Sequence, residues 1–129
     1  MRRPNHSRLA FVAVAVATLV VVGCSGGRAY CSKEAQCLAE EEDVELESDS
    51  VGVCVAQYDG NIAALRANEE PECQVLADAI VAADACRASL DCNDFFDAAD
   101  YQDACEDELD DLQDALNDVD DGRCSAQES

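Results

Sequence analysis

The sequence predicts a small all-α domain of two tandem αα-hairpins, about four helices in all, stapled by disulfides. Apolar residues recur at intervals of three and four along most of the chain, which is the period of an α-helix. Nine cysteines occur in 129 residues, a density typical of small secreted domains that bury too little apolar surface to fold without covalent support. Outside the short Val44 and Leu46 pair, no convincing apolar–polar alternation predicts a strand.

The cysteine spacing predicts that the two hairpins are repeats of each other. Eight cysteines form two sets, with the spacings C-x5-C-x16-C-x18-C and C-x5-C-x12-C-x18-C. The first set is Cys31, Cys37, Cys54 and Cys73, and the second is Cys86, Cys92, Cys105 and Cys124. Two of the three spacings agree, which favours a tandem duplication. We therefore assign residues 30–85 to the first hairpin, 86–124 to the second and 125–129 to a disordered tail.

Helices are predicted over residues 29–40, 50–67, 71–91 and 100–119. The last three rest on apolar stripes that step by three and four. The stripe of the second helix is Val51, Cys54 or Val55, Tyr58, Ile62 and Leu65. The stripe of the third is Leu76, Ile80, Ala83, Cys86 and Leu90, and that of the fourth is Tyr101, Cys105, Leu109, Leu112, Leu116 and Val119.

Several residues predict where these helices begin and what separates them. Pro71 suits the first position of a helix, and the acidic residues beside it favour the positive end of the helix dipole. Asp49 and Asp100 are candidate N-caps. Gly60 is expected to weaken or kink the second helix. The acidic stretch 40–49 is expected to be a solvated loop.

Helix geometry narrows the roughly one hundred ways of pairing eight cysteines. Cysteines six residues apart on one helix are separated by about 9 Å of rise, too far for a disulfide, so bonds within either C-x5-C pair are not expected. A Cys73–Cys86 bond is excluded if one helix carries both residues. A nested scheme is favoured among those left open. Its pairs are Cys37–Cys54, Cys92–Cys105, Cys31–Cys73 and Cys86–Cys124.

The N-terminal segment explains the ninth cysteine. Arg2, Arg3 and Arg8 precede an apolar run from Leu9 to Val22 that is too short for a stable membrane span. The run ends in Val21-Val22-Gly23-Cys24, which resembles the lipobox of a bacterial lipoprotein signal peptide. An ordinary secretory peptide with an incidental cysteine, or an uncleaved anchor, is the alternative.

The lipoprotein resemblance implies that residues 1–23 are removed and that Cys24 is acylated. Residues 24–29, including Ser25-Gly26-Gly27-Arg28, would then be a short flexible tether between the lipid bilayer and the domain. In lipoproteins of Gram-negative bacteria, Ser at the position of Ser25 is compatible with export to the outer membrane. The implied localisation is the cell envelope, with the outer membrane favoured if the host is Gram-negative. Eight cysteines would remain, an even number for an oxidising compartment.

The cysteine-rich region also resembles a group of proteins. Pro71-Glu72-Cys73 opening a helix and the C-x5-C pair Cys86–Cys92 are similar to helical cysteine-rich repeats in uncharacterised lipoproteins of Gram-negative bacteria with GC-rich genomes. The likeness covers about residues 31–124. It implies no activity, because that group has none assigned.

Composition excludes several function classes. Three of the eight basic residues lie in the predicted signal peptide and none of the 29 acidic residues does, so cleavage would change the net charge from −21 to −24. Such acidity excludes nucleic-acid binding and suits a basic protein partner or weak calcium association. The only histidine, His6, would leave with the signal peptide, which removes the usual general base and histidine metal ligands. We expect no enzyme activity, no metal site and no cofactor.

Three further features of the sequence bear on function. Residues 117–122, with Glu128, faintly resemble a calcium loop, but Val119 stands where an oxygen ligand is required. The carboxylates of 106–108 and 110–111 are expected to form a solvated helix face rather than an acid–base pair. Phe95 and Phe96 point to different sides, so one is expected in the core and the other exposed. Tyr58 and Tyr101 are expected in the core.

The sequence thus favours a membrane-anchored, non-enzymatic structural or protein-interaction module of the cell envelope. The alternative is an acidic inhibitor or sequestering protein for a basic hydrolase such as lysozyme, or a weak calcium binder.

Overall fold

The computed structural model describes residues 26–47, 49–119 and 123–124. This part of the chain forms six α-helices and no strand, which confirms the all-α class, with six helices rather than about four. The helices are α1 (Gly26–Glu41), α2 (Ser50–Ala67), α3 (Pro71–Ala88), α4 (Cys92–Phe96), α5 (Ala98–Ala104) and α6 (Glu106–Asp118). None of them is long and apolar enough to cross a bilayer.

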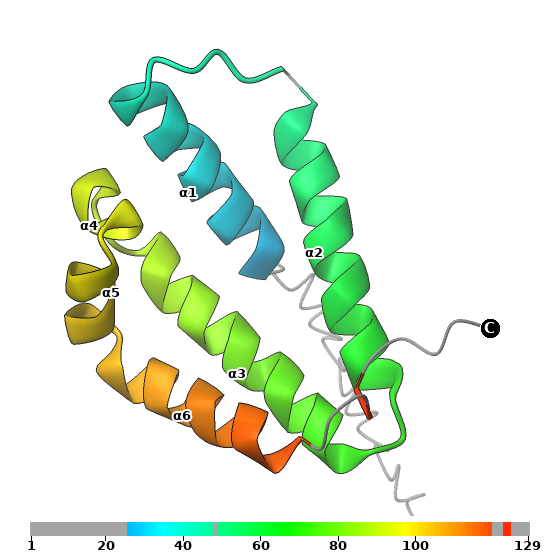
Figure 1. Ribbon diagram of the computed structural model, residues 1–129. Helices are drawn as coiled ribbons and strands as arrows, with labels where there is room; N and C mark the ends of the chain where they lie inside the picture. The colour runs from blue at the N-terminus through cyan, green and yellow to red at the C-terminus, as the bar shows by residue number, and fades with distance from the viewer. Residues whose placement is uncertain (1–25, 48, 120–122, 125–129) are drawn as a thin grey trace, which may run out of the picture.

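Helix α3 lies at the centre of the fold and contacts α1, α2 and α6 (Figure 1). Helices α1 and α2 run antiparallel and are joined by the acidic loop, as predicted. Helices α3 and α6 also run antiparallel, and the short helices α4 and α5 form the turn between them. Helix α4 packs against α1, so the turn of the second half of the chain contacts the first helix of the first half.

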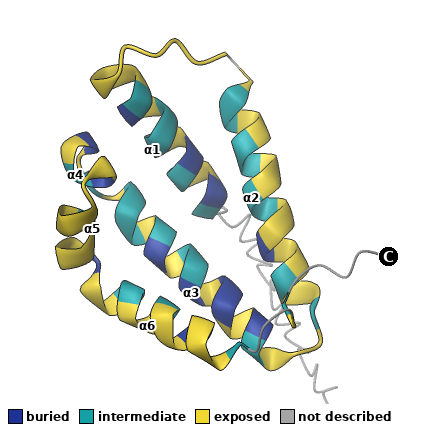
Figure 2. Cartoon of the chain, viewed as in Figure 1, coloured by how far each residue is buried: buried dark blue, intermediate teal, exposed yellow. Residues whose placement is uncertain are grey.

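The core is small and consists mainly of cysteine and alanine. The largest fully buried side chains are Phe95, Cys31, Cys37, Cys73 and Cys105. One cluster of buried side chains joins Leu76 and Ala79 of α3 to Ala115 of α6. Helix α5 has no buried residue and α6 has only Ala115, and both are largely exposed in Figure 2. Because so little aliphatic area is buried, the disulfides carry much of the stability.

The start of α1 corrects the prediction of a flexible tether, since residues 26–28 are already helical. Gly27 is buried against α2, where a Cβ at this position would lie 2.7 Å from Tyr58 Cδ1 and 2.8 Å from Asp59 Oδ1. A Cβ on Gly26 would lie 3.0 Å from Val81 Cγ1 of α3. These two glycines therefore allow the close approach of α1 to both neighbouring helices.

The predicted helix 50–67 has the bounds of α2, and it runs through Gly60 without a break. Pro71 is the first residue of α3, as predicted. Asp49 is the N-cap residue of α2, as predicted, but its side chain makes no capping hydrogen bond.

The predicted helix 71–91 ends early, at Ala88. Ser89 Oγ donates a hydrogen bond of 2.6 Å to the Cys86 carbonyl, a local bond that competes with helix continuation.

The predicted helix 100–119 is divided in the structure. Cys105 has φ −120° and ψ 33°, outside the helical range, and separates α5 from α6. The N-cap of α5 is Asp97 rather than Asp100: Asp97 Oδ1 accepts hydrogen bonds from the backbone amides of Ala99 and Asp100. The break rotates α6, so Leu116 is 49% exposed and Ala115 is buried in its place.

Candidate functional site

All eight cysteines from residue 31 onward are in disulfides, as expected. The bonds are Cys31–Cys54, Cys37–Cys92, Cys73–Cys124 and Cys86–Cys105, with Cα–Cα distances of 5.9, 4.9, 5.4 and 6.0 Å in that order. Cys24, the predicted lipidation site, lies outside the described residues.

The nested pairing was wrong in all four of its bonds. It assumed that every bond lies within one hairpin, whereas two of the observed bonds join the two predicted hairpins. Cys31 and Cys37 are six residues apart on α1, so they point about 120° apart around the helix axis. Cys31 faces α2, whereas Cys37 faces α4. In the second pair, the break after Ala88 places Cys92 on a separate helix.

The observed bonds have a symmetry that the sequence did not reveal. Within each set, the first cysteine is bonded to the third, as in Cys31–Cys54 and Cys86–Cys105. The second cysteines of the two sets are bonded to each other, and so are the fourth. If each cysteine of the first set is exchanged with the cysteine at the same place in the second set, the four bonded pairs stay the same. Each set therefore has one bond of its own, and two bonds join the first set (residues 30–85) to the second (residues 86–124).

Arg87 occupies an aromatic cluster that the sequence analysis did not anticipate. Its Cζ lies 4.6 Å from the ring centroid of Phe95, 5.0 Å from that of Tyr101 and 6.0 Å from that of Tyr30. Its Nε donates a hydrogen bond of 2.9 Å to the Phe95 carbonyl. Arg87 thus joins α3 to α1, α4 and α5 by cation–π contacts and one charge-assisted hydrogen bond. The only sign of this cluster in the sequence was that Arg87 lies on the apolar stripe of the third predicted helix.

Asp84 and Tyr58 lie on the α2 side of the same cluster. Burial raises the pKa of Asp84, although Tyr58 and Arg87 act in the opposite direction. Burial also raises the pKa of Tyr58, and the negative charge of Asp84 raises it further. The buried Tyr58 Oη approaches Asp84 without reaching good hydrogen-bond geometry. This group joins α2, through Tyr58, to α3, through Asp84.

Helices α1 and α2 diverge toward one end of the molecule (Figure 1). An open groove lies between them there. It has a volume of about 790 Å³. Its walls are α1, the loop and α2. The lining residues are Ala35, Gln36, Ala39, Asp43, Val44, Glu45, Leu46, Glu47, Ser50 and Val51. Half of these side chains are apolar and three are carboxylates.

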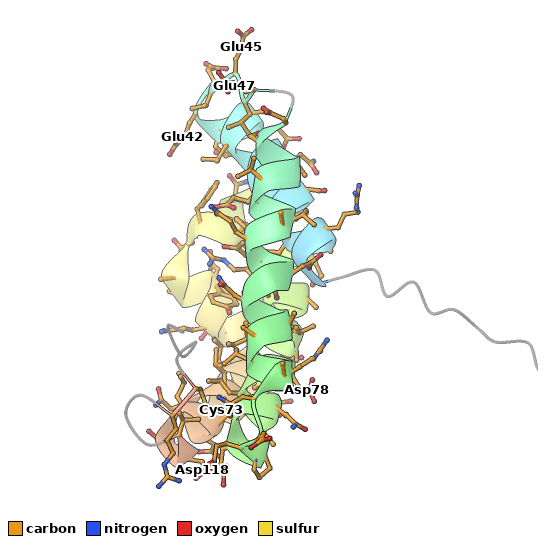
Figure 3. All side chains as sticks on the ribbon, turned by 90° about the vertical axis from the view of Figure 1, so that its right-hand side faces the viewer. Glu42, Glu45, Glu47, Cys73, Asp78 and Asp118 are labelled. Atoms are coloured by element: carbon orange, nitrogen blue, oxygen red, sulfur yellow. A yellow bond between two sulfur atoms is a disulfide. The ribbon has the colours of Figure 1, made fainter. Side chains whose placement is uncertain are left out.

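The loop beside the groove is strongly acidic. Seven of the ten residues from 40 to 49 are Glu or Asp. The sequence has no Lys or Arg between Lys33 and Arg66, so no basic side chain of this stretch neutralises them. Figure 3 shows Glu42, Glu45 and Glu47 at one end of the molecule, opposite Cys73 and Asp118. The groove therefore has a negative electrostatic potential.

The other candidate features do not come together as a site. Glu108 lies close to Cys86 and Cys105, but those two sulfur atoms are bonded to each other and cannot act as thiolate ligands. The carboxylates of 106–107 and 110–111 are exposed, as expected of a solvated face. Residues 120–122 and 128 of the suggested calcium loop lie outside the described residues.

The aromatic predictions are confirmed for Phe95, which is 1% exposed, and Phe96, which is 42% exposed. Tyr58 and Tyr101 are half-buried rather than in the core. Tyr101 contacts Arg87, and Tyr58 stacks on Tyr30 with ring centroids 6.1 Å apart.

Comparison with known proteins gives no relative from which to transfer a role. No protein-family model, curated protein or solved structure matches the chain.

Proposed function

We propose that the protein is a lipid-anchored, non-enzymatic module of the cell envelope, acting in structure or protein interaction. The observation that carries the proposal is the use of the cysteines. The chain has nine, and the eight from Cys31 onward bond to one another. Cys24 is the ninth and is the cysteine of the lipobox-like motif, so its thiol is the one available for acylation. Four disulfides also suit an oxidising compartment outside the cytoplasm.

The start of α1 bears on how such a module would sit at the membrane. Helix α1 begins at Gly26, two residues after Cys24. Two residues span at most about 8 Å, so the acylated residue would lie close to the folded domain. Gly26 and Gly27 are fixed between α2 and α3, so this end of the helix has little freedom to swing away. The domain would therefore be held near the bilayer instead of on a long linker.

We propose no catalytic role because of which reactive side chains the chain contains and where they lie. The only histidine is His6, inside the predicted signal peptide. Asp84, a carboxyl group with a raised pKa, faces Tyr58 and Arg87 in a packed helical cluster. Such an environment suits a role in packing the helices.

We also infer that the two halves arose by duplication. The matching cysteine spacings and the exchange symmetry of the four disulfides support this history. Bonds that join a cysteine of one repeat to the cysteine at the same place in the other repeat are typical of a duplicated pair.

The test is mass spectrometry of the full chain expressed in a bacterial host with two membranes and purified from the membrane fraction. We expect a mature chain beginning at Cys24, with the added mass of acyl chains. Reduction should add eight hydrogens, two for each disulfide. Peptides from the non-reduced protein should contain the four cross-links described above.

The matched control is Cys24→Ala, which keeps the rest of the segment and removes the thiol. It should neither incorporate labelled fatty acid nor be processed before residue 24. A wild-type chain with an unmodified Cys24 would overturn the anchor, and free thiols among the other eight cysteines would overturn the assigned compartment.

A second function, sequestration of a basic hydrolase, is favoured by the acidic loop alone. Inhibition of lysozyme activity by the purified protein, lost as the salt concentration rises, would support it. Capture of a neutral envelope protein in a salt-insensitive complex would favour the structural or interaction role.

A further inference from the structure

We propose that the groove between α1 and α2 binds a basic peptide segment with apolar side chains, presented by a partner protein. The inference rests on the proposed interaction role and names the surface and the partner chemistry that this role would use. Three observations support it. Apolar side chains line the groove and form what we call its floor, and the acidic side chains beside them form its rim, which no basic residue of the same stretch neutralises. The backbone of the loop also makes no hydrogen bond to another segment within the described residues.

The floor offers apolar surface to a ligand. Ala35 and Ala39 of α1 and Val51 of α2 line it, together with Val44 and Leu46 from the loop. Val44 is 39% exposed and Leu46 is 37% exposed, although both border the groove. Exposed apolar side chains rimmed by polar residues are typical of binding surfaces. A ligand with aliphatic side chains would remove this area from water.

The rim selects the charge of that ligand. Asp43, Glu45 and Glu47 line the groove directly, and the adjacent loop residues are also acidic. A lysine or arginine in the groove would gain attraction from several carboxylates at once. An acidic or nucleic-acid ligand would be repelled. Charge complementarity therefore commits the occupant to a basic segment.

The loop backbone offers hydrogen bonds to a peptide. Asp43 has φ 51°, in the left-handed region, and turns the chain out of α1. The chain then runs without regular structure to Glu47. Within the described residues, no backbone hydrogen bond joins residues 43–46 to another segment. The loop also alternates acidic and apolar residues, a pattern that an extended peptide with alternating basic and apolar residues would match.

The geometry favours a peptide over a single metal ion. A cation site needs several oxygen ligands converging on one point. Among the residues that the structure describes, no three carboxylates of this loop converge closely enough to hold an ion. A groove of about 790 Å³ has room for several side chains.

The test is fluorescence anisotropy of the full protein, purified oxidised from its membrane, with a labelled short peptide of alternating lysine and leucine. The first variant, Glu45→Gln with Glu47→Gln, removes two rim charges. The second, Val44→Ser with Leu46→Ser, removes apolar side chains without changing the charge. Each should raise Kd about tenfold or more, because each removes one of the two kinds of contact.

The matched control is Asp107→Asn with Asp111→Asn. It removes the same charge from exposed positions of α6, away from the groove. It should change Kd less than about twofold if recognition is local. A peptide of alternating lysine and serine should bind the wild type about as weakly as the leucine peptide binds the second variant. Circular dichroism of each variant checks that the helices are intact.

Equal weakening by the control and groove variants would overturn the proposal, because attraction by the whole acidic surface would then explain binding. Loss of peptide binding together with calcium binding that depends on Glu45 and Glu47 would replace it with a cation site. A cross-linked envelope partner mapped to another face would overturn the groove and leave the interaction module standing. Peptide binding by a protein with an unmodified Cys24 would support the groove and overturn the anchor.

Discussion

Cys37, near the C-terminal end of α1, is bonded to Cys92, the first residue of α4, with 4.9 Å between their Cα atoms. The bond joins the two halves of the chain across a separation of 55 residues, the longest of the four. It lies in the core cluster with Phe95 and packs against Tyr30. The two hairpins are therefore parts of one cooperative unit rather than independent modules.

Replacing Cys37 and Cys92 together by alanine should lower the free energy of unfolding by about 4 kcal/mol, because a long loop of the unfolded chain is released. Replacing Cys31 and Cys54, which are 23 residues apart, should cost about 0.8 kcal/mol less from loop length alone. Urea unfolding followed by circular dichroism measures both. An equal or larger loss in the second variant would contradict the dominant role of the bond between the halves.

The disulfide pairing shows where prediction from the sequence stopped. The spacing correctly excluded a Cys31–Cys37 bond, since both residues lie on α1 and the separation depends only on helix rise. Cys86 and Cys92 are also not bonded to each other, although they lie on separate helices. The choice among the remaining pairs depended on how the two hairpins pack, which places Cys92, the first residue of α4, against α1. Packing between elements far apart in the sequence has no local sequence pattern from which to predict it.

The groove was predictable only in part. The acidic loop and its exposed position followed from composition, and the bounds of α2 followed from the apolar stripe of that helix. The hollow depends on the angle between α1 and α2, which pack closely at Gly27 and Tyr58 and are joined by Cys31–Cys54. A contact between two residues on different helices leaves no periodic pattern in the sequence. The role of Arg87 was missed for the same reason, because its aromatic partners come from three other helices.

Arg87→Lys should lower the free energy of unfolding by about 1–3 kcal/mol even though it keeps the charge. Lysine cannot reproduce the planar stacking on Phe95 and Tyr101 or the directed hydrogen bond to the Phe95 carbonyl. The control is Arg66→Lys, whose ion pair with Asp78 at 3.1 Å is exposed and contributes less than about 1 kcal/mol. Thermal unfolding of the two variants should separate them, and equal effects would show that the aromatic cluster adds little.

Gly27→Ala should destabilise the protein, because the new methyl group would lie 2.7 Å from Tyr58 Cδ1 and force α1 away from α2. Gly60→Ala on α2 is the matched control. Its Cβ would meet nothing within 4 Å, so the higher helix propensity of alanine should stabilise the protein by about 0.5–1 kcal/mol. The two substitutions should thus shift the urea midpoint in opposite directions. A stabilised Gly27→Ala variant would contradict the close packing of α1.

Asp84 should make the protein less stable as the pH rises from the acidic range. Burial raises its pKa above the ordinary value of 3.8, so the folded state binds this proton more tightly than the unfolded state does. The contribution of this group to stability is full below about pH 3.8 and is lost as the pH rises through the folded-state pKa. Asp84→Asn, which stays neutral, should therefore gain stability relative to the wild type as the pH is raised from 3 to 7. Urea unfolding of both proteins at several pH values measures this difference. A difference that does not change with pH would mean that Arg87 and Tyr58 fully compensate the burial of the Asp84 carboxylate.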